Sequence, residues 1–237
     1  GVERLLRRVS EWFDGVLPVV KQGNTHFGFA VIDLFARWRG LDQLFLDMVD
    51  RPAWLHGVLD RLTTGMLTML DDLEAGGALS LNNGAHYCGS GGVGFTDELP
   101  AADFDGERVR PEDMWGFATT QIFSEVSPSM HEEFALRYEK RWLSRFGLNA
   151  YGCCEPLHHK LEGVFEIPRL RRLSMSPWVD VSVAAERIGN RCIFSRKPNP
   201  APLAAPTWEP EAVRRELRDD LERTRGCVVE LVMKDTH

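Results

Sequence analysis

The residues best suited to chemistry are two adjacent cysteines, Cys153 and Cys154, which are followed directly by Glu155. Thiolates bind soft or borderline metal ions such as zinc, and a carboxylate or an imidazole, such as that of Glu155 or His158, can complete the site. Alternatively, one cysteine packs as a small apolar side chain and the other is an idle thiol. Closed zinc sites usually contain a second Cys/His pair, whereas the histidines here are scattered, so both interpretations stay open.

These cysteines follow one of several short apolar segments that alternate with amphipathic helices. One helix is predicted to begin at Asp50-Arg51-Pro52, with Asp50 as its cap, and to end at Gly76-Gly77. A second should begin after Ser127-Pro128, with large apolar residues at four-residue intervals at Met130, Phe134, Tyr138, Trp142 and Phe146. Strands are predicted over residues 17–20, 78–81, 113–118, 148–153, 170–175, 191–195 and 226–232.

This alternation of strand and helix, repeated about seven times, predicts an α/β fold with a parallel sheet. The even repeat and the lack of a glycine-rich dinucleotide-binding turn favour a (β/α)8 TIM-type barrel over an open sheet. An eighth unit is missing, so we expect the barrel to be incomplete at one or both chain ends. A single domain over residues 1–237 is expected, because 237 residues with 43% hydrophobic content suffice for one large core.

Composition restricts the class of partner. The formal net charge is -7, from 28 Lys and Arg against 35 Asp and Glu, which argues against nucleic-acid binding and favours a small molecule or another protein. No apolar run approaches the roughly 18 residues of a membrane-spanning helix, and the first residues do not resemble a secretion signal. We therefore expect a cytoplasmic protein that does not bind membranes, with its five cysteines reduced.

In a barrel of this kind the chemistry takes place at the carboxyl edge of the sheet, the side on which the parallel strands end. Nearly every residue that follows a predicted strand is polar or ionisable, which supports an active site at this edge. These residues are Lys21, Gln22, Asn82, Asn83, His86, Gln121, Glu125, Tyr151, Cys153, Cys154, Glu155, Ser176, Trp178, Asp180, Arg196, Lys197, Asn199, Lys234, Asp235 and His237.

Single residues at this edge have alternative interpretations. Glu155 and Asp180 could be acid-base groups or helix N-caps, and for Asp180, which precedes a predicted helix, capping is at least as plausible. Arg196 and Lys197 could hold a substrate carboxylate or phosphate. The glycine-rich segment 89–94 is predicted to be a mobile lid or ligand-approach loop, because no helix follows it to bind phosphate. Three histidines on helical segments are predicted to lie at the surface, namely His131, His158 and His159.

Several short motifs, spread over nearly the whole chain, carry a resemblance to a known family. They are Gln22-Gly23-Asn24-Thr25, Asp50-Arg51-Pro52 with His56, Glu74-Ala75-Gly76-Gly77-Ala78, Tyr151-Gly152-Cys153, Ser176 to Asp180, Ile188-Gly189 and Lys197-Pro198-Asn199-Pro200. In these motifs the chain resembles the uroporphyrinogen decarboxylase superfamily, which includes cobalamin-dependent methyltransferases that act with corrinoid proteins. The resemblance implies a (β/α)8 barrel with a deep cleft at the carboxyl edge.

The methyltransferase branch implies a zinc ion, held by a His-x-Cys pair and a later cysteine, that activates a substrate thiol. Here Tyr151 occupies the histidine position, Cys153 and Cys154 the first cysteine position, and His237 the later position. We therefore expect methyl transfer between a small substrate and a corrinoid or thiol acceptor, with the corrinoid carried by a partner protein. Cys153, Cys154 and His237 are assigned as metal ligands, and Glu155, Asp180 and Tyr151 as catalytic groups. Eight residues are assigned to substrate binding: Gln22, Asn82, His86, Gln121, Trp178, Arg196, Lys197 and Asn199.

Two other functions stay open. Decarboxylation of uroporphyrinogen or another carboxylated substrate needs no metal, only cations that hold carboxylates and a polar group near the developing carbanion, for which Arg196, Lys197 and His237 would serve. That branch also needs an arginine-rich segment and an aspartate expected before residue 1, so the chain is interpreted as part of a longer family member. The third alternative is a non-catalytic protein that binds a corrinoid or tetrapyrrole. The resemblance also implies a homodimer.

Overall fold

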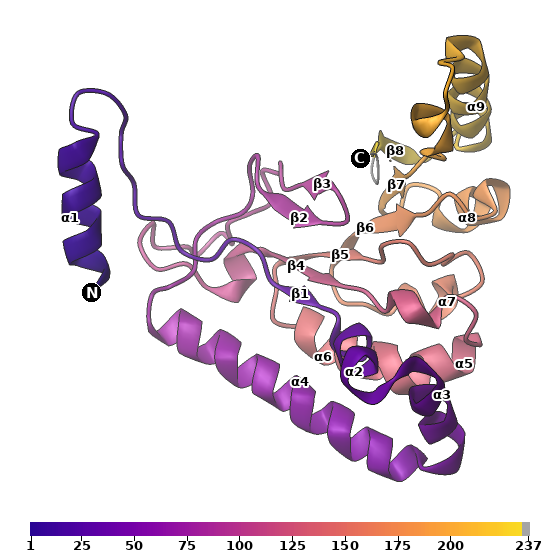
Figure 1. Ribbon diagram of the computed structural model, residues 1–237, viewed down its shortest axis with the longest axis horizontal. Helices are drawn as coiled ribbons and strands as arrows, with labels where there is room; N and C mark the ends of the chain where they lie inside the picture. Colours follow the sequence, from indigo (N-terminus) through magenta and orange to yellow (C-terminus); the bar gives the residue numbers. More distant parts are fainter. Residues whose placement is uncertain (234–237) are drawn as a thin grey trace.

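The structure is a computed structural model that describes residues 1–233. Its centre is a sheet of six parallel strands in the order β1-β4-β5-β6-β7-β8 (Figure 1). The strands are β1 (Gly28–Phe29), β4 (Trp115–Ala118), β5 (Leu148–Tyr151), β6 (Leu170–Met175), β7 (Ile193–Arg196) and β8 (Val228–Leu231). The predicted α/β fold with a parallel sheet is thus confirmed, whereas residues 1–233 form an open sheet and not a complete eight-stranded barrel.

The predicted strand positions are most accurate in the middle of the sheet. Strands β5 and β6 lie where the apolar runs at 148–153 and 170–175 place them. The prediction of a strand over residues 17–20 is wrong, because no strand forms there and the first strand begins at Gly28. Residues 78–81 form only an isolated parallel bridge, between Leu79 and Asn24.

Helices cover one face of the sheet and enclose the main hydrophobic core. The prediction of a helix after Pro52 is confirmed, but Asp50 is not its cap, because Asp50 ends the preceding helix and Arg51 takes the N-cap position. The side chain of Ser127 caps the next predicted helix by accepting a hydrogen bond from the Met130 amide. These helices are α2 (Val31–Arg39), α3 (Leu41–Asp50), α4 (Pro52–Ala75), α5 (Pro128–His131) and α6 (Arg137–Leu143), with a π-helical segment (Glu132–Leu136) joining α5 to α6.

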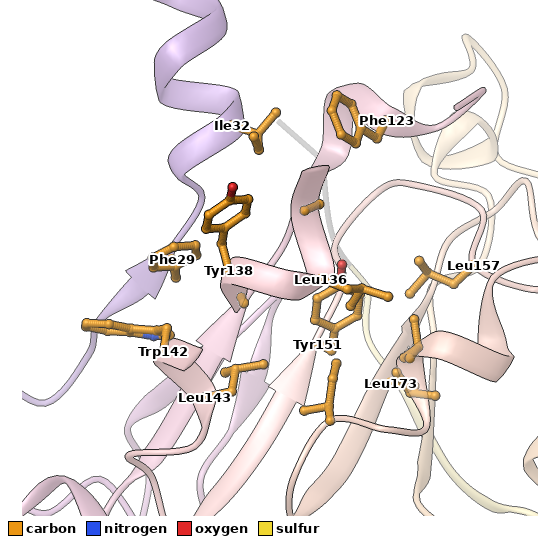
Figure 2. Packing of buried hydrophobic residues seen from close by; sticks show 14 of the residues in the cluster. Phe29, Ile32, Phe123, Leu136, Tyr138, Trp142, Leu143, Tyr151, Leu157 and Leu173 are labelled. Carbon is orange, nitrogen blue, oxygen red and sulfur yellow. The ribbon is translucent and has the colours of Figure 1, made fainter. Parts of the chain in front are cut away.

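The core between these helices and the sheet is rich in aromatic side chains. Trp142 of α6 stacks on Phe29 of β1 with ring centroids 5.6 Å apart, and Tyr151 of β5 lies beneath the same helical segment (Figure 2). Aromatic side chains bury large apolar areas, so they contribute much of the packing energy.

A β-hairpin packs on the opposite face of the sheet. Its strands are β2 (Tyr87–Gly89) and β3 (Gly92–Val93), which pair antiparallel. Cys88 of the hairpin lies in a small core with Trp115 and Phe117 of β4. A Cβ atom on Gly89 would come 2.2 Å from the Phe117 ring, so only glycine allows this close approach. The glycine-rich segment predicted to be a mobile loop is therefore largely a packed hairpin.

The described chain contains four further α-helices. They are α1 (Val2–Trp12), α7 (Leu161–Val164), α8 (Val181–Ile188) and α9 (Pro210–Arg223). Helix α1 projects away from the rest of the molecule (Figure 1), and none of its residues is buried. Within residues 1–233, no helix combines the length and the apolar character that crossing a membrane requires.

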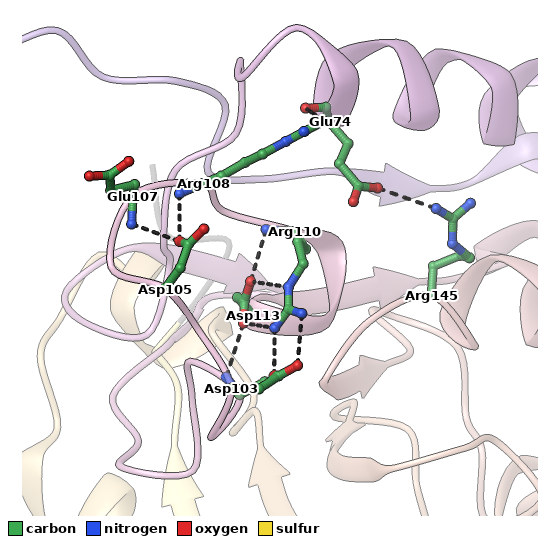
Figure 3. Close-up of polar contacts among 9 residues, drawn as sticks. Glu74, Asp103, Asp105, Glu107, Arg108, Arg110, Asp113 and Arg145 are labelled. Carbon is green, nitrogen blue, oxygen red and sulfur yellow. Dashed lines mark hydrogen bonds and ion pairs between the residues drawn. The ribbon is translucent and has the colours of Figure 1, made fainter.

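The segment that precedes β4 is held by ion pairs (Figure 3). The guanidinium of Arg110 contacts Asp103 at 2.7 Å and Asp113 at 3.0 Å, and Arg145 contacts Glu74 at 3.5 Å. The carboxylates beside Arg110 raise its pKa further above its already high value. These charges neutralise one another at the amino ends of the strands, so we assign them a structural role.

Candidate functional site

The two adjacent cysteines lie immediately beyond β5, at the carboxyl edge of the sheet. Gly152, between the strand and the thiols, has a φ of 84°, a left-handed conformation that favours glycine and turns the chain sharply. The sulfur atoms of Cys153 and Cys154 lie 3.5 Å apart, well beyond the roughly 2.05 Å of a disulfide bond. Cys153 is buried and Cys154 is half-buried, so the pair is presented at the surface of the core.

Glu155 fixes the backbone of this cysteine loop. One carboxylate oxygen accepts a hydrogen bond of 2.8 Å from the Cys153 amide, and the other accepts one of 2.9 Å from the Thr119 hydroxyl, beyond the end of β4. Burial raises the pKa of Glu155 above its ordinary value. Glu155 therefore links the ends of β4 and β5 and does not cap a helix.

Tyr151 belongs to a buried hydrogen-bonded chain on the helix-covered side of the sheet. Its hydroxyl donates to Glu139 at 2.8 Å, so His131, 2.9 Å away, must donate to that hydroxyl through Nε2. The second oxygen of Glu139 accepts a hydrogen bond of 2.7 Å from Thr120. The sequence indicated neither Glu139 nor the partnership with His131, because both contacts depend on how the helix packs.

The pKa values of these hydrogen-bonded side chains are shifted because the side chains are buried. Burial raises the pKa of Glu139 from 4.5 to about 8 and lowers that of His131 from 6.5 to about 3. Burial also raises the pKa of Tyr151 well above its ordinary value. His131 is thus neutral at physiological pH. The prediction that His131 and His158 lie at the surface is wrong, because both are buried.

Lys197, just beyond β7, reaches the cysteine loop from the hairpin side. Its ammonium donates to the Cys153 carbonyl oxygen at 2.7 Å and to the hydroxyl oxygens of Ser90 and Ser174. Only 2% of the Lys197 surface is exposed. The structure thus brings Lys197, which follows β7, to the loop after β5 that carries Cys153 and Glu155.

Arg196 lies on the other face of the sheet from Lys197. Successive side chains of a strand point to opposite faces, so two adjacent cations cannot grip one ligand from a regular strand. The guanidinium of Arg196 contacts the Asp220 carboxylate at 2.7 Å and donates to the Ser176 carbonyl oxygen at 2.7 Å. Both Arg196 and Asp220 are buried, so we assign this pair to the attachment of α9 to the sheet.

The remaining predicted substrate-binding residues do not converge on the thiols through any described contact. Asn82 is buried and bonds the Trp115 backbone amide at 2.8 Å and its carbonyl oxygen at 3.1 Å, which is a structural role. Gln22 and His86 contact each other at 2.9 Å. The other three are Gln121, whose side chain is exposed, Trp178, which is 73% exposed, and Asn199, whose side chain accepts a turn hydrogen bond from the Ala201 amide.

Asp180 caps helix α8, as the alternative interpretation of the sequence predicted. Its carboxylate accepts hydrogen bonds from the amides of Ser182 at 3.0 Å and Val183 at 3.1 Å. These bonds, that of Val183 first, lower the pKa of Asp180 below its ordinary value.

The Asp180→Ala substitution should therefore lower the melting temperature by about 2–4 °C, because the first turn of α8 loses its cap. Asp180→Asn should leave it nearly unchanged, since asparagine caps equally well. Thermal unfolding followed by circular dichroism measures both. If Asp180→Ala instead kept the wild-type melting temperature, Asp180 would not act as a stabilising cap.

The metal site predicted from the sequence lies partly beyond the described chain. His237, the third predicted ligand, lies outside residues 1–233. Within the described chain, no group of three or more His, Cys, Asp or Glu side chains is arranged to hold a metal ion. Comparison of the chain with protein-family models, with curated proteins and with solved structures finds no match. The fold and the local geometry thus define an α/β protein with a cluster of chemical groups at its carboxyl edge. This cluster consists of the Cys153 and Cys154 thiols, the Glu155 carboxylate and the Lys197 ammonium.

Proposed function

We propose that the chain is part of a (β/α)8-type barrel enzyme, similar to the uroporphyrinogen decarboxylase superfamily, that transfers a methyl group between a small substrate and a corrinoid or thiol acceptor. The observation that carries this proposal is the pair of sulfur atoms 3.5 Å apart at the end of β5. In barrels of this class catalytic groups lie at the carboxyl ends of strands, which is where the pair lies. A corrinoid-carrying partner protein, a homodimer and a cytoplasmic location belong to the same proposal.

The geometry of the thiols suits a zinc ion. Two thiolates bound to one tetrahedral zinc at about 2.3 Å lie roughly 3.8 Å apart, close to the separation of Cys153 and Cys154. These two residues would hold the metal, with His237 as the proposed third ligand. Zinc would lower the pKa of a bound thiol, so that the thiolate can act as a nucleophile.

The surrounding residues would orient the reactive groups. Glu155 holds the Cys153 amide at 2.8 Å, and Lys197 holds the Cys153 carbonyl oxygen at 2.7 Å, so the peptide on either side of this thiol is fixed. A fixed backbone limits the directions in which the thiol can point, which favours one productive geometry. The role proposed for Glu155 and Lys197 is therefore positioning, with Tyr151 supporting β5 from the other face.

Decarboxylation is a weaker alternative. That reaction would rely on cations to hold substrate carboxylates. Arg196, one of the two cations considered for it, already pairs with Asp220 on the opposite face of the sheet. This arrangement favours methyl transfer.

Metal content and methyl transfer should depend on the same two thiols. We expect stoichiometric zinc in the purified protein, and a loss of zinc affinity of at least roughly 100-fold in Cys153→Ser and Cys154→Ser. Methyl transfer from methylcobalamin to 2-mercaptoethanol, followed by the absorbance of the cobalamin, should fall in parallel. Cys192→Ser, a buried cysteine at the amino end of β7, is the matched control and should change neither quantity.

Other outcomes would point to the alternatives. Metal-free protein that decarboxylates uroporphyrinogen would replace methyl transfer with the decarboxylase function. Corrinoid or tetrapyrrole binding that survives Cys153→Ser, with no turnover of any donor, would indicate a non-catalytic binding protein.

A further inference from the structure

Helix α1 carries an exposed apolar face. Its apolar side chains recur at intervals of three and four residues, so they lie on one side of the helix. None of its residues is buried, and Trp12 is 65% exposed. We call this side the α1 apolar face; it consists of Val2, Leu5, Leu6, Val9 and Trp12, with Phe13 directly after the helix. A surface helix normally packs such a face against a core, so we expect this face to have a partner.

Two arginines border the α1 apolar face. The guanidinium of Arg8 lies over the Trp12 ring, 5.1 Å from its centre. Arg4 lies one helical turn before Arg8, so both cations are on the same side of the helix. A partner surface that suits this arrangement is apolar and bordered by carboxylates.

Helix α3 presents a surface of this kind. Leu46 and Val49 lie on its outer side and are 53% and 71% exposed. Asp42 and Asp50 lie one helical turn before and after Leu46, and both are exposed. We call these four residues the α3 surface. Exposed apolar side chains of the neighbouring α2 are Leu34 and Trp38.

The charged groups that border these two surfaces are not paired with each other within one chain. No ion pair within residues 1–233 involves any of them, namely Arg4, Arg8, Asp42 and Asp50. Helices α1 and α3 of one chain lie well apart (Figure 1), so a contact between the two surfaces needs a second copy.

The segment that follows α1 suits an exchange between two copies. Residues 13–27 contain no helix and no strand, apart from the isolated bridge at Asn24. Helix α1 is therefore attached as an arm. In a reciprocal exchange, α1 of each copy packs on α3 of the other, and two-fold symmetry makes the same contact twice.

The area available is sufficient for a dimer. The six side chains of the α1 apolar face offer roughly 500 Å² of apolar surface, estimated from the area that a buried aliphatic side chain removes from water. Two exchanged arms and the surfaces that they cover would then bury on the order of 2,000 Å², and stable interfaces bury about 1,200–2,000 Å².

A membrane is the other usual occupant of an amphipathic helix with arginines. Helices that lie on membranes are rich in Lys and Arg on their polar face. Helix α1 has three arginines but also two glutamates, Glu3 and Glu11. The chain as a whole has a net charge of -7, so an anionic lipid surface would repel it. The same net charge leaves the rest of the chain negative, which favours a second copy as the partner of α1.

We propose that α1 docks on the α3 surface of a second copy, and that two copies form a dimer by reciprocal exchange of α1. Trp12 and Leu5 would contact Leu46 and Val49, and the arginines would pair with Asp42 and Asp50. This inference rests on the homodimer of the proposed function and names the surface that forms it. It involves none of the residues assigned to methyl transfer.

Sedimentation equilibrium of the full chain would measure the dissociation constant of the dimer. Trp12→Ser should weaken dimerisation at least roughly 100-fold, because the lost contact occurs twice in the dimer. Its side chain is exposed in one copy, so the melting temperature of the monomer should not change. The matched controls are Arg7→Glu, on the opposite side of α1, and Asp72→Arg, at an exposed position of α4; each should change the dissociation constant less than about threefold.

Charge exchange between two variants tests the pairing of the two surfaces. One variant combines Arg4→Glu with Arg8→Glu, and the other combines Asp42→Arg with Asp50→Arg. Each alone should dimerise about 100-fold more weakly, because like charges then meet across both contacts. An equal mixture of the two should form a heterodimer about as tight as the wild-type dimer, since each α1 again meets the opposite charge. A variant that had merely lost its fold could not recover in this way.

The remaining outcomes would overturn the inference. A dimer that is as tight in Trp12→Ser as in the wild type, or a mixture that forms no heterodimer, would leave the homodimer but place its interface elsewhere. A chain that is monomeric at every concentration would disprove the homodimer as well, whereas methyl transfer by that monomer would leave the catalytic proposal intact. A monomer that binds phosphatidylserine vesicles, and loses them in Trp12→Ser, would assign α1 to a membrane surface.

Discussion

Replacing Asp220 with alanine is expected to lower the free energy of unfolding by about 4 kcal/mol, because it leaves the buried guanidinium of Arg196 without its carboxylate. The two groups lie 2.7 Å apart, and each side chain is at most 7% exposed. A buried charge that loses its partner pays most of its desolvation cost without compensation. Urea unfolding followed by circular dichroism would measure the loss.

Two further variants distinguish the loss of this ion pair from a general effect of substitutions in α9 on stability. Asp219→Ala, at the neighbouring position, removes a carboxylate that pairs with Arg223 at the surface, and it should cost less than about 1 kcal/mol. The double variant Arg196→Met with Asp220→Ala should recover part of the lost stability, since no unpaired charge remains. If Arg196→Met instead left stability intact and abolished substrate binding, the original assignment of Arg196 to the substrate site would be correct.

Glu139→Gln is expected to change the pH dependence of stability. A carboxyl group whose pKa rises from 4.5 in the unfolded chain to about 8 in the folded protein binds its proton more tightly when folded. Its stabilising contribution is complete below pH 4.5 and is lost as the pH rises to about 8, a loss on the order of 5 kcal/mol. Glutamine has no proton to lose, so this loss should disappear from the variant.

Urea unfolding at pH 5, 7 and 9 would measure the effect. Relative to the wild-type protein, Glu139→Gln should be slightly less stable at the lowest pH and clearly more stable at the highest. Glu186→Gln, an exposed position on α8, is the control and should follow the wild-type curve. Parallel curves for Glu139→Gln and the wild type would show that Glu139 does not titrate in this range.

Much of the sheet could be predicted because its strands are short apolar runs between clear helix boundaries. Strands β5 and β6 lie where their apolar runs place them. The run at 17–20 has the same apolar character but pairs with no strand among residues 1–233, and Val20 is exposed. Local sequence indicates that a segment could be a strand, whereas pairing depends on parts of the chain that are distant in sequence.

The site could be predicted where it depends on fold class, and not where it depends on packing. Parallel strands deliver their final residues to one edge, so the meeting of Cys153 and Lys197 follows from topology. The separation of Arg196 from Lys197 follows from strand alternation and could have been predicted in the same way. The contact of Ser90 with Lys197 could not, because it depends on a hairpin that folds over the sheet.

The π-helical segment Glu132–Leu136 determines the directions in which the side chains before and after it point. An α-helix rotates by about 100° per residue, so His131 and Glu139 would differ in direction by roughly 80° in a regular helix. A π-helical turn contains one more residue than an α-helical turn, so the difference in direction between the two side chains falls to roughly 20°. Both side chains can then reach Tyr151.

The π-helical turn also lowers the mean rotation per residue along this segment. The four-residue spacing from Met130 to Phe146 matches this lower rotation better than it matches the usual 3.6-residue repeat. Deleting one residue from the π-helical segment would therefore leave a helix, but either His131 or Glu139 would no longer reach Tyr151.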